Sequence, residues 1–63
     1  MPLINIQMIK GRTLEQKRKL IETVTKAVCD SVNVSPEKVR IVITDLEPEN
    51  YSISGKLAID KNN

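Results

Sequence analysis

The chain has 63 residues with one cysteine, no histidine and a formal net charge of +2. This length allows a single domain over residues 1–63, and the composition argues against an internal disulfide or a structural zinc site. The ten basic and eight acidic side chains are interspersed, so we expect no nucleic-acid partner. No apolar run approaches the ~20 residues of a membrane span, and none forms a signal peptide. We therefore expect a cytoplasmic protein without a membrane partner.

The first half of the chain predicts a strand followed by a long helix. Residues 3–9 alternate apolar and polar side chains, as a half-buried strand does. Thr13 and Gln16 have the spacing of a capping box, and Asn33 is a typical C-terminal stop, so the helix should run to about Val32. Its expected apolar stripe consists of Leu20, Ile21, Val24, Ala27, Val28 and Val32.

The second half predicts a further strand and a short C-terminal arm. Ser35 and Pro36 are typical of a short turn, with Ser35 capping and Pro36 at its first position. Residues 39–44 are dense in β-branched side chains and give the strongest strand signal. Residues 48–50 predict a turn. Residues 51–54 then predict a short strand or hairpin arm that Gly55 ends.

A strand, a helix and a strand in this order predict an α+β fold built on one β-α-β unit with parallel strands. One helix can cover only one face of a two-stranded sheet. The other face still carries apolar side chains, and parallel sheets are normally covered on both faces. The two sheet edges are also open. We therefore expect an obligate oligomer in which another copy supplies the second layer.

The second residue, Pro2, can supply an unusual base. If Met1 is removed, the ring nitrogen becomes a free secondary amine, and a free α-amino group has a reference pKa of roughly 7.7–8.0. A modest decrease in that pKa would make it a general base suited to neutral pH. With Met1 retained, the nitrogen is an amide without basicity.

Two arginines are candidates to serve the same site. Arg40 opens the second strand, so parallel pairing should put it beside Pro2. Arg12 follows the first strand and should lie on the order of 25 Å from Pro2 of its own chain. It can reach a Pro2 only from another chain, so a site that uses both arginines is shared between subunits. Guanidinium groups bind carboxylates through two parallel hydrogen bonds, and their charge would lower the pKa of the amine.

The chain resembles the 4-oxalocrotonate tautomerase family over nearly its whole length. The similarity lies in Pro2 before an apolar strand, residues 11–12, residues 15–17, residues 39–44 and residues 51–58. The resemblance implies a β-α-β subunit with a short C-terminal hairpin arm. Two subunits would share a four-stranded sheet, and three such dimers would form a homohexamer. It implies no cofactor and no metal.

The resemblance also implies roles for five residues. Pro2 would be the general base, moving a proton between the hydroxyl and a carbon of 2-hydroxymuconate-like acids. Arg40 would bind the carboxylate and oxo end, Arg12 would bind the distal carboxylate, and Tyr51 and Ile9 would line the pocket. Tyr51 departs from the family, which has phenylalanine there. Ser52 and Ser54 depart from a segment that is glycine-rich in close relatives.

Two other functions fit parts of the sequence. A hydratase or dehalogenase of small unsaturated acids would keep the same residues but would need a carboxylate to activate water, for which Asp45, Glu47 and Glu49 qualify by type. A small β-α-α DNA-binding dimer would fit the length and basic pI, but it needs a helix over residues 39–44.

Overall fold

The strand expected over residues 3–9 is present as β1 (Leu3–Ile9) in the computed structural model, which describes residues 2–61. It pairs in parallel with β2 (Arg40–Leu46), from Leu3 opposite Arg40 to Ile9 opposite Leu46. The parallel arrangement is therefore confirmed. β2 begins one residue later and ends two residues later than predicted, because Asp45 and Leu46 continue the pairing with the end of β1.

The helix α1 (Leu14–Val32) has the predicted ends. The Gln16 backbone N–H donates to the Thr13 hydroxyl over 3.0 Å, and the Thr13 N–H donates to the Gln16 side-chain oxygen over 2.9 Å. Both halves of the capping box are therefore made. Asn33 ends the helix in the left-handed conformation, with φ 59°, and its N–H donates to the Cys29 carbonyl. A single 3₁₀ turn, Pro36–Lys38, then leads into β2. Ser35 precedes that turn, but its side chain makes no capping hydrogen bond.

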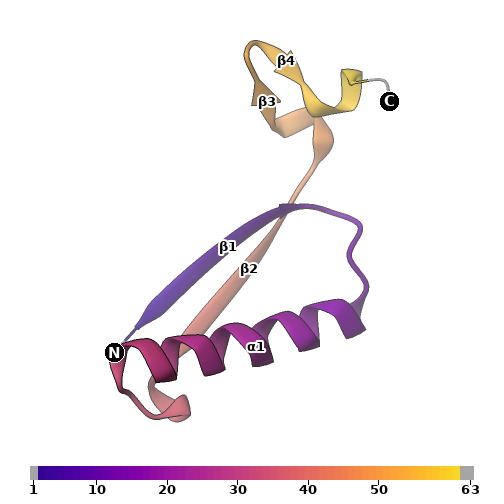
Figure 1. Cartoon of the computed structure of the whole chain (residues 1–63). Coiled ribbons are helices and arrows are strands. Elements are labelled where there is room, and N and C mark those ends of the chain that lie inside the picture. The colour runs from indigo at the N-terminus through magenta and orange to yellow at the C-terminus, as the bar shows by residue number, and fades with distance from the viewer. Residues whose placement is uncertain (1, 62–63) are drawn as a thin grey trace.

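The C-terminal arm is a small antiparallel hairpin flanked by two 3₁₀ turns, Pro48–Asn50 and Ala58–Asp60. The expected hairpin arm is therefore confirmed. Its strands are β3 (Ser52–Ile53), within the predicted residues 51–54, and β4 (Lys56–Leu57), whose bounds were not predicted. Ser54 and Gly55 make the connection with positive φ angles of 54° and 81°. Two consecutive positive φ angles are typical of the tight turns that join hairpin strands. Figure 1 shows the arm at the far end of β2, away from α1.

The helix lies over one face of the two-stranded sheet (Figure 1). The side chains beneath it are only half-buried, and they are Ile4, Ile6, Met8, Ile41 and Ile43. On the other face, Leu3 is 60% exposed and Val42 is 48% exposed. None of the described residues is fully buried. The apolar stripe of α1 is also only partly used: Leu20, Val24 and Val28 are half-buried, whereas Ile21, Ala27 and Val32 are exposed. Two strands are too narrow a layer to cover the flanks of the helix.

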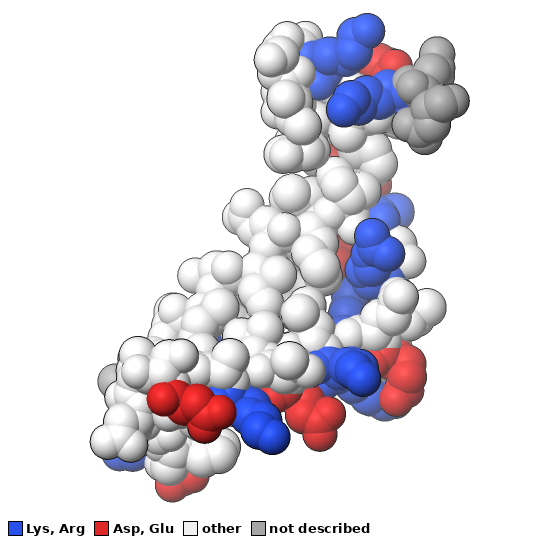
Figure 2. All heavy atoms as spheres, viewed as in Figure 1, with Lys and Arg blue, Asp and Glu red and all other residues white. Residues whose placement is uncertain are grey.

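The chain is more extended than a self-sufficient domain of its length. Its accessible surface is 5202 Å², against roughly 4,100 Å² for a folded monomer of this mass. Its radius of gyration is 14.8 Å, against about 10.6 Å for a compact domain. The surface seen in Figure 2 is largely uncharged over the strands, while charged side chains gather along α1, the loop before it and the arm. None of the described helices is long and apolar enough to cross a membrane.

Candidate active site

Pro2 and Arg40 lie together at the edge of the sheet where both strands begin. The Arg40 backbone N–H donates to the Pro2 carbonyl over 3.0 Å, and Arg40 is the pairing partner of Leu3. Pro2 is half-buried and Arg40 is exposed. Nη1 of Arg40 donates to the Glu37 carbonyl over 3.0 Å, which anchors one side of the guanidinium. The predicted neighbourhood of these two residues is present. Met1, whose removal would free the Pro2 nitrogen, lies outside the described residues.

Ile9 and Arg12 lie at the opposite end of the same strand. Ile9 ends β1, and the strand that separates it from Leu3 is about 20 Å long. Arg12 is exposed in the loop before α1. It lines a hollow of about 180 Å³ whose other walls are Met8, Gln16, Lys17 and Leu20. Arg12 is therefore far from Pro2 of its own chain, as the strand length predicts.

Tyr51 lies in the C-terminal arm, in a third place. Its carbonyl accepts a hydrogen bond from the Ala58 N–H over 2.8 Å, and the residue is 39% exposed. The arm follows the end of β2 that is remote from Arg40 (Figure 1). The structure thus brings Pro2 and Arg40 together, but it does not bring Arg12, Ile9 or Tyr51 to them within one chain. A site that uses all five residues requires a second copy.

Two of the three acidic side chains considered for water activation, Asp45 and Glu47, are engaged by lysines. Asp45 Oδ2 lies 2.9 Å from Lys17 Nζ, and Glu47 Oε2 lies 3.1 Å from Lys10 Nζ. Both pairs lie at the end of the sheet away from Pro2. Within residues 2–61, no group of three or more cysteine or carboxylate side chains is arranged to hold a metal ion.

Lys17 was not identified from the sequence. Its side chain is only 28% exposed, because it points from the first turns of α1 toward the sheet. Lys17 lies on the same helix face as Leu20, Val24 and Val28, which follow it by three, seven and eleven residues. A charged residue in line with an apolar stripe is a signal for a paired or functional side chain, and this signal could have found it.

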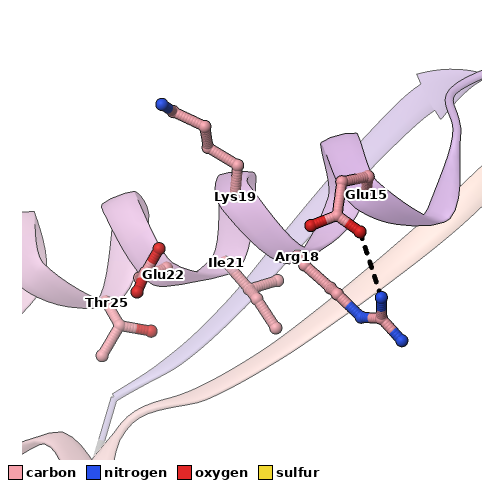
Figure 3. A pocket seen from close by; sticks show the side chains of 6 residues that line it. All are labelled: Glu15, Arg18, Lys19, Ile21, Glu22 and Thr25. Atoms are coloured by element: carbon pink, nitrogen blue, oxygen red, sulfur yellow. Dashed lines mark hydrogen bonds and ion pairs between the residues drawn. The ribbon is translucent and has the colours of Figure 1, made fainter.

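A second hollow lies on the exposed side of α1 and contains none of the predicted site residues. Its walls are Glu15, Arg18, Lys19, Ile21, Glu22 and Thr25 (Figure 3). Arg18 and Glu15 form an exposed ion pair of 3.1 Å there. Surface pairs of this kind contribute about 0–1 kcal/mol, so we attribute a local structural role to it.

Comparison with protein families matches residues 2–61 to a model described as tautomerase enzyme. The chain is 40% identical over 60 residues to a 2-hydroxymuconate tautomerase of Bacillus subtilis, covering 95% of this chain and 97% of the relative. It is 36% identical over 61 residues to a probable tautomerase of Halalkalibacterium halodurans, covering 97% and 100%. The similarity therefore includes nearly the whole of each chain.

Solved structures agree with these relatives. A crystal structure of a homologue of 4-oxalocrotonate tautomerase matches with a TM-score of 0.94 and 38% identity, covering 97% of this chain and 100% of that one. A 4-oxalocrotonate tautomerase isozyme from Methylibium petroleiphilum matches with a TM-score of 0.88 and 45% identity, covering 92% and 94%. The fold expected from the sequence is thus confirmed. The DNA-binding alternative is wrong in its fold, because β2 occupies the segment where it needs a helix.

Proposed function

This chain belongs to the tautomerase family, and we propose that it interconverts the enol and keto forms of small unsaturated 2-hydroxy acids such as 2-hydroxymuconate. The family assignment makes the protein an isomerase. The proposed substrate class comes from two relatives that are named 2-hydroxymuconate tautomerases, at 40% and 42% identity. The observation that carries the proposal is the position of Arg40 beside Pro2, at the edge where both strands begin.

In the proposed reaction, Pro2 acts after Met1 has been removed. Its neutral ring nitrogen takes the proton of the substrate hydroxyl and returns a proton to a carbon of the conjugated chain. Arg40 binds the adjacent carboxylate and stabilises the negative charge that develops on the oxygen. Its hydrogen bond to the Glu37 carbonyl leaves the other guanidinium donors available for substrate. The positive charge of Arg40 also lowers the pKa of the amine.

Arg12 is proposed to bind the distal carboxylate of a substrate held at the Pro2 of another copy. The separation of Arg12 from Pro2 within one chain supports this arrangement. So do the uncovered sheet face and the excess exposed surface. We propose a homohexamer, built as three dimers. One solved relative, from Chloroflexus aurantiacus, is described as a heterohexamer. Tyr51 and Ile9 are proposed to wall the pocket.

A hydratase or dehalogenase is the weaker candidate. Two of its three candidate carboxylates, Asp45 and Glu47, are already bound to lysines. Measurable turnover of a halogenated acrylate would favour it over the tautomerase.

The proposal is tested by following ketonisation of 2-hydroxymuconate. The protein must first be shown by intact mass to lack Met1. We expect the Pro2→Ala variant to lose roughly 100-fold or more in kcat/KM, because general-base catalysis contributes about 10²–10⁴-fold. Equal rates for the two proteins would refute the assignment of Pro2.

A further inference from the structure

Two cationic side chains, Arg12 and Lys17, line the hollow described above. Its other walls are Met8, Gln16 and Leu20. The ammonium group of Lys17 is bound to Asp45 at 2.9 Å, across the helix-sheet boundary. The Gln16 side chain is engaged in the helix cap. Arg12 makes no ion pair with any residue of the described part of the chain. Arg12 is therefore the free cation of this hollow, and Lys17 is the neutralised one.

Asp45 is a carboxylate that contacts two of the residues lining this hollow, Met8 and Lys17. It is the pairing partner of Met8, so it lies one strand away from a wall of the hollow. It is on the helix-facing side of β2, where it meets Lys17. Carboxylates bind guanidinium groups strongly and in the same geometry as a substrate carboxylate would. If Lys17 were absent, Asp45 would keep an unpaired charge one strand away from the hollow that Arg12 lines.

We propose that Lys17 is a positioning residue for substrate selection, which keeps Arg12 available for a distal carboxylate by occupying Asp45. The inference rests on the proposed function in one respect, namely that Arg12 binds that carboxylate. Lys17 does not touch the substrate in this account. Its effect should therefore fall on acids with a carboxylate at both ends, and not on acids that lack the distal one.

The test compares KM and kcat for 2-hydroxymuconate, with two carboxylates, and phenylenolpyruvate, with one. We define the KM ratio as the KM for 2-hydroxymuconate divided by the KM for phenylenolpyruvate. In Lys17→Met we expect this ratio to rise roughly tenfold, which is the effect of losing one charge-assisted hydrogen bond. The kcat values should change little. The double variant Lys17→Met with Asp45→Asn removes the competing carboxylate, so it should return the ratio close to that of the parent.

Two further variants make the outcomes distinguishable. Lys10→Met breaks the matched pair with Glu47, outside the hollow, and should leave the ratio unchanged. Arg12→Ala should raise the ratio by itself. If Arg12→Ala raises the ratio and Lys17→Met does not, the role of Lys17 is refuted and that of Arg12 stands. If the double variant fails to restore the ratio, neutralisation of Asp45 is refuted. If Arg12→Ala has no effect, the proposed carboxylate anchor fails as well.

Discussion

Arg40 and Arg12 carry the same charge but have different surroundings. Arg40 is held at the start of β2 by two hydrogen bonds. One guanidinium nitrogen donates to the Glu37 carbonyl, and the backbone N–H donates to the Pro2 carbonyl. Arg12 lies in an exposed loop beside a hollow. A guanidinium held at the strand edge where Pro2 lies suits charge that is proposed to develop there, whereas a guanidinium far from Pro2 suits binding of a remote carboxylate.

This difference predicts distinct kinetic effects. Arg40→Lys keeps the charge but loses the planar fork, so we expect kcat to fall roughly 100-fold with either substrate, as when one oxyanion donor is removed. Arg12→Lys should mainly raise KM for the dicarboxylate. Steady-state kinetics with both substrates measure this. A KM effect without a kcat effect in Arg40→Lys would contradict the proposed stabilisation of the enolate.

At the scale of elements, the cap of α1 sets where the helix begins and therefore where the Arg12 loop ends. The Thr13 hydroxyl accepts a hydrogen bond from the Gln16 backbone N–H, so Thr13→Ala should lower the free energy of unfolding by about 1 kcal/mol. Thr23→Ala, at an exposed position within the helix, is the matched control and should be neutral or slightly stabilising. Denaturation at one fixed protein concentration compares them. Equal destabilisation by both variants would contradict the capping role.

The elements that could be predicted are those with local signals. β1 was predicted with its observed bounds and α1 from its N-cap to about its last residue, because apolar periodicity and the cap residues lie within or next to the elements themselves. The predicted second strand ended two residues before β2 does, because the last two residues of β2 are in the strand through their pairing with β1. The hairpin arm was expected but the bounds of β4 were not predicted, since a two-residue strand has no periodicity and depends on the Ser54–Gly55 turn.

The candidate site was predictable only where strand pairing places it. Parallel pairing puts Arg40 beside Pro2, and the structure agrees. The pairing of Lys17 with Asp45 joins residues 28 positions apart. No local pattern specifies such a contact, although the place of Lys17 on the inner face of α1 indicates that it has a partner.

At the scale of the whole molecule, the exposed apolar surface predicts association. Leu3, Val42 and Ile59 are each about half exposed or more, on the open sheet face and on the arm. We expect sedimentation equilibrium to give about six times the 7.1 kDa mass of one chain. Because Arg12 is proposed to act on another copy, specific activity should fall as dilution dissociates the oligomer. A monomer with undiminished activity would contradict the shared site.

The pH dependence of kcat/KM tests whether the Pro2 nitrogen is the general base, as proposed. The measurement uses two mass-verified samples, one without Met1 and one that retains it. In the first, kcat/KM should rise with pH as the amine loses its proton, with an apparent pKa below the roughly 7.7–8.0 of a free α-amino group. The second should be nearly inactive at every pH. Equal activity of the two samples, with the same ascending limb, would contradict the account.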